Sequence, residues 1–294
     1  MAASALASVK TFTLDLGPTR APLELSSWPR VMGILNITPD SFSDGGQFAD
    51  PGAAVDHAHA MVAAGADLLD LGAESTRPGG GVYGEGCAEL SVDEEWRRLE
   101  AVLPRLRSEL GTAVISVDTR KAEVARRALA AGADLVNDVG GLRDPAMVAL
   151  VAAKGCPIIV MHSRGELRTM QQNIHFGEVV SEVRAELLAI AEKAIAAGIR
   201  RQQIVFDPGI GFGKKLEHNL SLLARLEELG DDYPLLVGAS RKSFISQLSP
   251  APPGERLGGS LAAAARAAAA GVALLRVHDV GPTVQFLKVL RAIS

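Results

Sequence analysis

Several short apolar runs of this chain end in side chains that can ionise or form hydrogen bonds. Asp118 ends the run ISVD, Asp207 ends IVFD, and Asn137 lies in LVND. A buried carboxylate is costly unless it is paired or bound to a ligand, so two that share one cavity predict a ligand rich in N–H groups. Together with Lys242, these residues suit a planar ring that makes several hydrogen bonds.

A second set of residues suits an anion, namely Asn36, Arg77, Arg276 and His278. Arginine donates two parallel hydrogen bonds to a phosphate group. The amide oxygen of asparagine can join the coordination of Mg²⁺, which keeps several waters and also binds phosphate oxygens. The two sets together predict a site for a heterocycle that carries a phosphate or diphosphate, with Mg²⁺ as the cofactor.

The elements that must position these residues repeat along the chain. Eight apolar runs alternate with amphipathic stretches, and these runs are 31–36, 67–73, 113–118, 135–138, 157–162, 204–207, 234–239 and 273–278. The amphipathic stretches are 51–64, 92–110, 121–130, 145–153, 178–197, 216–228, 256–270 and 282–293. This alternation predicts an α/β fold, a (β/α)8 TIM barrel, which typically takes about 250 residues. An open, doubly wound sheet is the alternative.

The carboxyl ends of the strands are where barrel enzymes build their sites. A polar residue at one strand end can instead cap the following helix, and Asp138 or Ser240 suits that role. Polar groups follow nearly every apolar run, which is more than capping explains. We therefore expect the active site at this end of the barrel.

Segments outside the repeat predict a hairpin and two loops. Residues 10–28 alternate in hydropathy around a Gly-Pro turn, which predicts a β-hairpin within an N-terminal extension of residues 1–30, ahead of a barrel of residues 31–294. The connections 38–50 and 74–91 are unusually long. Long loops in a compact domain are usually functional or disordered, so we expect both to close over the site, with tolerated insertions as the alternative.

Composition and charge argue against several classes of protein. The formal net charge is −4 without a block of basic residues, so we expect no nucleic-acid partner. No run of about 18 apolar residues occurs, so we expect no membrane segment. The two cysteines, Cys87 and Cys156, have no CxxC partner, and we expect free thiols in a reducing cytoplasm.

Seven segments between residue 31 and the C-terminus resemble dihydropteroate synthases and occur in that family's order. They are GILNITPDSFSDGG at 33–46, GAESTRPG at 72–79, SVDT at 116–119, ND at 137–138, DPGIGFGK at 207–214, GASRKSF at 238–244 and RVHD at 276–279. The family condenses (7,8-dihydropterin-6-yl)methyl diphosphate with 4-aminobenzoate to dihydropteroate and diphosphate, in folate biosynthesis. The resemblance implies a TIM barrel and a transferase of this kind.

The resemblance also implies a role for each matching residue. The pterin would be held by Asp118, Asn137, Asp207 and Lys242, in a slot lined by Met161, Phe212 and Gly238. Mg²⁺ would bind at Asn36, and the diphosphate would be bound by Thr76, Arg77, Arg276 and His278. The pocket for 4-aminobenzoate would include Phe42, Pro78 and Ser243, with the carboxylate near the helix that follows Ser243.

An SN1-like reaction follows from the chemistry of that family. Because an aromatic amine is a weak nucleophile, early loss of diphosphate is attractive, and a dihydropterin can delocalise the resulting cation beside Asp118. Arg276, His278 and Mg²⁺ would stabilise the departing diphosphate. The implied catalytic residues are therefore Asp118, Lys242, Arg276 and His278. The resemblance also implies small-molecule substrates, a homodimer and a sulfonamide target.

One segment departs from the family pattern, and two other functions stay open. Residues 163–168 read SRGELR, which leaves the conformation of the loop after the fifth barrel strand open. Methyltransferases that use methyltetrahydrofolate have a similar pterin-binding barrel but need no diphosphate-binding site. A catalytically silent pterin-binding paralogue is the other alternative, although no motif is degraded.

Overall fold

Eight parallel strands form the centre of the molecule. The computed structural model describes residues 11–17, 20–26, 28–37, 50–74, 90–165, 170, 174–230 and 232–294. The strands are β3 (Arg30–Asn36), β4 (Leu68–Gly72), β5 (Val114–Asp118), β6 (Leu135–Asp138), β7 (Ile158–Met161), β8 (Ile204–Asp207), β9 (Leu236–Val237) and β10 (Leu274–Val277). They pair in the order β8-β7-β6-β5-β4-β3-β10-β9, and a parallel bridge from Phe206 to Leu235 joins the two edges. The sheet therefore closes into the expected TIM barrel.

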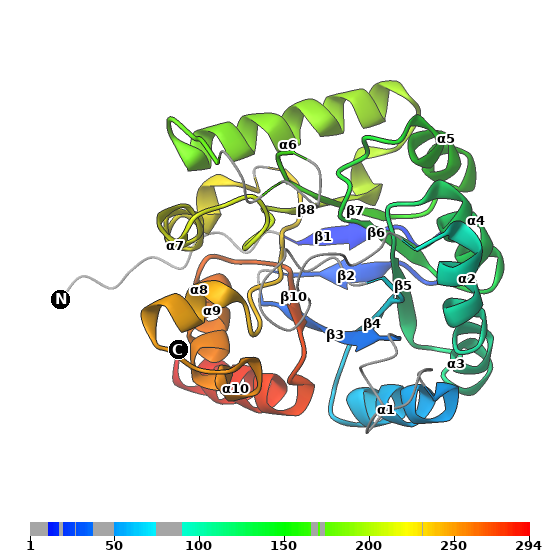
Figure 1. The fold of residues 1–294 in the computed structure, drawn as a ribbon, viewed down its shortest axis with the longest axis horizontal. Coiled ribbons are helices and arrows are strands. Elements are labelled where there is room, and N and C mark those ends of the chain that lie inside the picture. Colours follow the sequence, from blue (N-terminus) through cyan, green and yellow to red (C-terminus); the bar gives the residue numbers. More distant parts are fainter. Residues whose placement is uncertain are drawn as a thin grey trace.

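Helices surround these strands (Figure 1). They are α1 (Pro51–Ala63), α2 (Val92–Glu100), α3 (Leu103–Glu109), α4 (Ala122–Ala130), α5 (Pro145–Lys154), α6 (Val179–Ala196), α7 (Leu216–Ala224), α8 (Ser243–Leu248), α9 (Leu257–Ala269) and α10 (Val280–Ile293). The stretch 92–110, expected to be one segment, is divided between α2 and α3. Proline lacks a backbone N–H and fits the first turn of a helix, where Pro104 lies in α3.

Alternation along the strands separates an outer from an inner set of side chains. Outward residues such as Leu69, Ile115 and Val136 pack with the helices in the largest hydrophobic cluster. The first inward apolar residue of each strand joins a second cluster, which contains Met32, Leu68, Val114, Leu135, Ile159, Val205, Leu236 and Leu274. Because side chains alternate in a strand, the residues two and four positions further along face the same interior.

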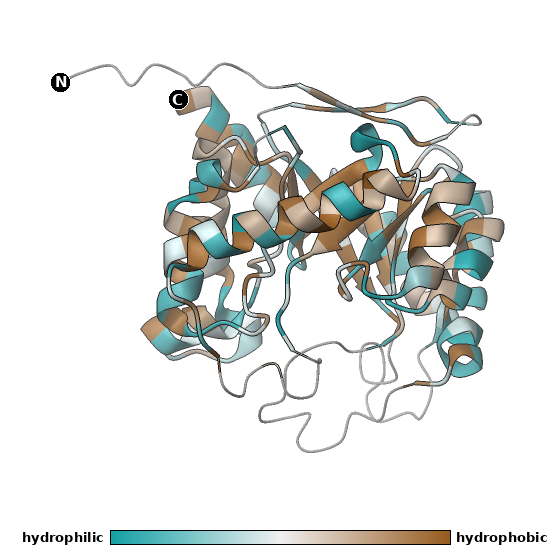
Figure 2. Cartoon of the chain, turned by 90° about the horizontal axis from the view of Figure 1, so that it is seen from above, coloured by the Kyte–Doolittle hydropathy of each residue, from teal (hydrophilic) through white to brown (hydrophobic). Residues whose placement is uncertain are grey.

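An antiparallel hairpin covers the amino ends of these strands. It consists of β1 (Phe12–Leu14) and β2 (Leu23–Leu25), as the sequence predicts. Leu14 and Leu25 are fully buried and belong to the same cluster as the first inward layer of the barrel. Burial of each leucine contributes roughly 1.5–3 kcal/mol. Figure 2 shows the hairpin crossing one end of the apolar barrel.

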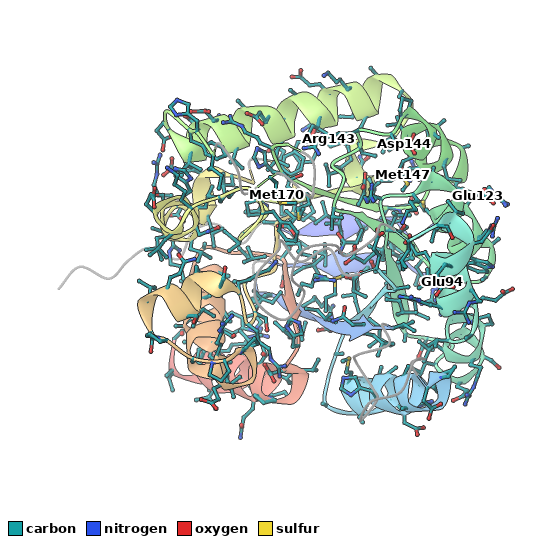
Figure 3. All side chains as sticks on the ribbon, in the orientation of Figure 1. Glu94, Glu123, Arg143, Asp144, Met147 and Met170 are labelled. Atoms are coloured by element: carbon teal, nitrogen blue, oxygen red, sulfur yellow. The ribbon has the colours of Figure 1, made fainter. Side chains whose placement is uncertain are left out.

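Paired arginines lie on the outer helices, where they bind glutamates of the same helix. Arg97 and Arg98 bind Glu94 of α2, and Arg126 and Arg127 bind Glu123 of α4. Both glutamates are labelled on the outside of the barrel in Figure 3. Among the described residues, no helix combines the length and apolar character needed to cross a bilayer. Cys156 is a buried free thiol, whereas Cys87 lies outside the described residues.

Candidate active site

The inner positions change from apolar to polar toward the carboxyl ends of the strands. In β5 the inward residues are Val114, Ser116 and Asp118, and all three are buried. The same parity places the sequence-predicted residues Asn36, Asn137, Met161, Asp207, Gly238, Arg276 and His278 on the inner face or its continuation. The barrel thus gathers at one end residues that lie up to 242 positions apart in the sequence, Asn36 and His278.

Arg276 is held between two carboxylates. Its Nε donates to Oδ2 of Asp70 over 2.6 Å, and its Nη2 donates to Oδ2 of Asp118 over 2.7 Å. Desolvation lowers the pKa of Arg276, but Asp70 and Asp118 outweigh it and hold the pKa above its ordinary value. The sequence placed Arg276 and Asp118 in different sets of residues, whereas the structure brings them into contact.

Asp70 is a site residue that the pattern of polar strand ends does not predict. It lies in the middle of β4 and is 0% exposed. Its Oδ2 also accepts a hydrogen bond from Nδ2 of Asn137 over 3.0 Å. Asp70 precedes the end of β4 by two residues, so it does not fit the pattern of polar residues at strand ends. A charged residue within the apolar run LLDLG, at an inward position, is the signal that identifies it.

Two buried carboxyl groups have raised pKa values. Burial raises the pKa of Asp118 to about 7, even though the charge of Arg276 opposes the shift. Burial also raises the pKa of Asp207, opposed by a hydrogen bond from the Gly209 N–H and by the charge of Lys242. Raised pKa values in a cleft are typical of groups that bind or react with ligands.

Buried oxygens of this cluster are left without partners among the described residues. They are Oδ1 of Asp70, Oγ of Ser116, Oδ1 of Asp118 and Oδ1 of Asn137. Buried polar atoms are nearly always hydrogen-bonded in folded proteins. These four atoms are acceptors or hydroxyls of two successive inner layers, Asp70 with Ser116 and Asp118 with Asn137, which suits a ligand that donates several hydrogen bonds.

The glycine-rich segment after β8 brings Phe212 against Lys242. The ammonium Nζ of Lys242 lies 3.9 Å from the centre of the Phe212 ring. Phe212 belongs to a small buried cluster with Val139, Met161 and Met170, and the last of these is labelled in Figure 3. The predicted slot residues Met161 and Phe212 are therefore in one cluster.

Lys214 ties this segment to the end of β7. Its Nζ contacts Nδ1 of His162 over 3.1 Å and donates to the carbonyl oxygens of His162, Gly209 and Phe212. Burial lowers the pKa of Lys214 to about 7, opposed by the charge of Asp207. Since Nε2 of His162 lies 3.0 Å from a carboxylate oxygen of Glu186, the network assigns the ring proton to Nε2.

The loops after β9 and β10 are joined. The backbone N–H of His278 donates to Oγ of Ser240 over 3.2 Å, and Nδ1 of His278 lies 3.1 Å from the same oxygen. Arg241 has a φ of +58°, an unusual value for a non-glycine residue, and its guanidinium binds the carboxylate of Asp279. The Ser240–His278 and Arg241–Asp279 contacts thus join the loop before Lys242 to the loop that carries His278.

Other predicted residues have less specific surroundings. Gly238 follows β9, and a Cβ there would meet the side chain of Arg276 at an ordinary distance of 3.8 Å. Ser243 is exposed and begins α8. Asp138 accepts hydrogen bonds from the N–H groups of Gly140 and Leu142 in the loop after β6, whereas Asp144 caps α5, so the expected helix capping by Asp138 is wrong. The predicted residues Phe42, Thr76, Arg77 and Pro78 lie outside the described residues.

A metal site made only of described His, Cys, Asp or Glu side chains is not found. Asn36 ends β3 and pairs in register with Gly72, beside the strand that carries Arg276. A single amide oxygen fits Mg²⁺ when the ion keeps waters and takes substrate phosphate oxygens as its other ligands. The donor set therefore fits Mg²⁺ bound together with a phosphorylated ligand.

Comparisons with known proteins agree with this geometry. The family model described as "Pterin binding enzyme" matches residues 32–278, so the fold and the site define a pterin-binding barrel. The dihydropteroate synthase of Escherichia coli strain K12 is 45% identical over 267 residues, which cover 90% of this chain and 92% of that protein. The chain belongs to the dihydropteroate synthase family.

Two solved structures extend the comparison to ligand complexes. The Yersinia pestis dihydropteroate synthase, solved in a complex with a sulfonamide drug, superposes with a TM-score of 0.85 at 42% identity, over 93% of this chain and 96% of that chain. The Xanthomonas albilineans dihydropteroate synthase, solved with 7,8-dihydropteroate, has a TM-score of 0.80 at 42% identity, over 92% and 95% of the two chains.

Proposed function

We propose that the protein condenses (7,8-dihydropterin-6-yl)methyl diphosphate with 4-aminobenzoate to form dihydropteroate and diphosphate. The observation that carries the proposal is the buried cluster of Asp70, Asp118, Asn137 and Arg276, whose free oxygens suit a ring with several N–H donors. Family membership supports the same reaction, since similar enzymes bind 7,8-dihydropteroate and a sulfonamide drug. The protein is accordingly a transferase of folate biosynthesis and a sulfonamide target.

The pterin ring would be held by Asp118, Asn137, Asp207 and Lys242. The two carboxylates and the amide oxygen accept hydrogen bonds from ring N–H groups, while Lys242 donates. When the C–O bond breaks, positive charge spreads into the dihydropterin, and the ionised Asp118 stabilises it. Met161, Phe212 and Gly238 would line the slot and exclude water from the ring.

The diphosphate would leave toward Arg276 and His278, with Thr76 and Arg77 completing its binding site. Asn36 would hold Mg²⁺, which supplies charge neutralisation for the departing diphosphate. Arg276 is already oriented by two carboxylates, so little reorganisation is needed when an anion approaches. The amine of 4-aminobenzoate would then attack from the pocket that the family resemblance assigns to Phe42, Pro78 and Ser243.

A coupled assay of diphosphate release tests the proposal. The purified protein with Mg²⁺ should release one diphosphate for each dihydropteroate formed. Continued release of diphosphate should require 4-aminobenzoate. Asp118→Asn should bind the pterin weakly and lose most turnover, whereas Glu123→Gln on the outer face of α4 serves as the matched control. Full turnover in Asp118→Asn would remove the cation-stabilising role of that carboxylate.

The two alternative functions give different outcomes in the same assay. A methyltransferase would bind a reduced folate without releasing diphosphate, and a silent paralogue would bind pterin without either reaction. The joined polar pairs Ser240–His278 and Arg241–Asp279 favour the synthase, because they hold the loops that carry Lys242 and His278. Neither alternative predicts diphosphate release.

We further propose a homodimer in the cytoplasm. Large apolar side chains of the C-terminal helices support a self-association surface, because Val289 and Ile293 of α10 are 56% and 76% exposed. Sedimentation velocity of the wild type and of Val289→Glu tests the assembly. A monomeric wild type at micromolar concentration would contradict it.

A further inference from the structure

Asp70 occupies an unusual place for a charged residue. It lies in the centre of β4, in the run LLDLG, where every residue is buried. In register it lies opposite Ile34 of β3 and Ser116 of β5. An ionised carboxylate is costly in such surroundings unless other groups compensate it. What Asp70 binds therefore indicates why a charge is placed there.

The carboxylate connects residues from three strands. Oδ2 of Asp70 accepts from Nε of Arg276 over 2.6 Å and from Nδ2 of Asn137 over 3.0 Å. Arg276 belongs to β10 and Asn137 belongs to β6. In the strand order, these two strands lie on opposite sides of β4, the strand that carries Asp70. One buried oxygen thus orients two residues that the proposed function assigns to substrate binding.

The contact with Asn137 fixes which end of its amide faces the ligand. A carboxylate can only accept hydrogen bonds, so Asn137 must turn its NH2 group toward Asp70. Oδ1 of Asn137 then points away, and it is buried and accepts no hydrogen bond from a described residue. An amide oxygen in that position is an acceptor reserved for a ligand N–H.

The contact with Arg276 fixes the plane of its guanidinium. Nε binds Asp70 while Nη2 binds Asp118, so both carboxylates lie along one edge of the fork. In the proposed function the remaining edge would bind the diphosphate. The paired charges also link Asp70 to Asp118, since the charge of Asp70 acts to raise the pKa of Asp118.

We propose that Asp70 is a positioning residue of the active site, which sets the amide orientation of Asn137 and the guanidinium plane of Arg276 for the pterin substrate. This inference rests on the proposed function. In this role Asp70 acts through Asn137 and Arg276, the two residues that its Oδ2 contacts. Its negative charge is essential to the role, because an uncharged amide at position 70 could donate as well as accept and would leave the orientation of Asn137 undetermined.

Asp70→Asn tests the role because it keeps the shape and removes the charge. Binding is measured by calorimetry with 6-hydroxymethyl-7,8-dihydropterin, and turnover is measured with the diphosphate substrate. We expect a loss of about tenfold or more in pterin affinity, as for the loss of a buried charged hydrogen bond. Glu123→Gln on α4 is the control, since it also removes a carboxylate charge but lies on the outer face of the barrel, and it should stay within about twofold of the wild type.

Two further readouts separate positioning from a general structural role. In an Asn137→Ala background, Asp70→Asn should cost much less affinity than in the wild type, because one of its two partners is gone. The pH midpoint of pterin binding should also move down in Asp70→Asn. The charged groups that act on Asp118 are Arg276, Asp70, Glu95 and Asp138, and only the charge of Asp70 is removed.

The outcomes distinguish this inference from the proposed function. Wild-type turnover combined with unchanged affinity and pH midpoint in Asp70→Asn would overturn the inference alone. Pterin binding without diphosphate release in the wild type would overturn the proposed reaction, while the binding measurements still decide the role of Asp70. If Asp70→Asn fails to fold, Asp70→Ser leaves room for a water, and the same two readouts apply to it. Additive effects in the double variant would refute action through Asn137.

Discussion

Binding of a pterin should depend on pH through the ionisation of Asp118. Burial raises the pKa of this carboxyl group to about 7 in the unliganded protein, so about half of the molecules carry a neutral Asp118 at neutral pH. A ring that donates N–H groups binds the carboxylate and favours the ionised form. The apparent dissociation constant should therefore improve by about tenfold between pH 6 and pH 8, since only the ionised fraction binds.

Calorimetry with 6-hydroxymethyl-7,8-dihydropterin measures the pH dependence of the dissociation constant. This ligand has no diphosphate group whose own ionisation would change with pH. At pH 7 the binding enthalpy should differ between phosphate and Tris buffers by the heat of releasing about half a proton. Asp118→Asn removes the titrating group and should flatten the pH dependence. Burial also raises the pKa of Asp138 to about 6, so Asp138 could add to the pH dependence of pterin binding. Asp138 is still present in Asp118→Asn, so any pH dependence that remains in this variant measures the contribution of Asp138.

A dissociation constant that stays flat from pH 6 to pH 8 would refute the reasoning. The same slope in the wild type and in Asp118→Asn would show that another group releases the proton. Either result would mean that the charge of Arg276 lowers the pKa of Asp118 by more than burial raises it. Asp118 would then already be ionised before the ligand binds.

Three further predictions concern stability and the metal. Gly209→Ala should lower the free energy of unfolding by roughly 2 kcal/mol or more in urea titrations, because Gly209 has a φ of +67° and a Cβ there would collide with the carbonyl oxygen of His162. The free energy of unfolding should fall as pH drops from 6.5 to 4, by up to about 3 kcal/mol from His162. Its pKa is lowered to about 4 in the folded state by burial, so the unfolded chain takes up the proton first. Removal of Mg²⁺ with EDTA should suppress turnover of the diphosphate substrate but leave binding of the hydroxymethyl pterin unchanged, and Asn36→Ala should raise the Mg²⁺ concentration required by about tenfold.

Each of these predictions has a matched comparison. A methyl group added at Gly258 in α9 would meet open space, so equal destabilisation by Gly258→Ala would contradict the collision argument. His162→Asn should have a shallower loss of stability toward pH 4 than the wild type, and parallel curves would exclude His162 as the cause. For the metal, equal turnover with and without EDTA would contradict a role for Mg²⁺.

The barrel and most of its inner polar residues could be predicted because they follow local periodicity. An apolar run that ends in Asp118 or Asp207 is visible in the sequence itself, and strand ends meet at one end of a parallel barrel. The hairpin is similarly local, since its strands and turn lie within residues 12–25. Family motifs then supplied the identity of the ligand, which periodicity alone does not.

Contacts across the barrel could not be predicted in the same way. Asp70 and Arg276 are 206 positions apart, and their pairing depends on the strand order and register. The polar residues were therefore divided into a pterin set and an anion set, while Arg276 and Asp118 are in fact hydrogen-bonded. The break between α2 and α3 was missed because both helices share one amphipathic pattern.

The hairpin at the amino end of the barrel also affects the order in which the two substrates bind. Leu14, Leu16 and Leu25 seal that end against the first inward layer, so ligands exchange through the carboxyl end. A heterocycle that reaches Asp70 and Asn137 lies deep in this opening, beneath any molecule that binds near Ser243. The pterin must then enter before the second substrate, and steady-state kinetics should show an ordered rather than a random sequence of additions.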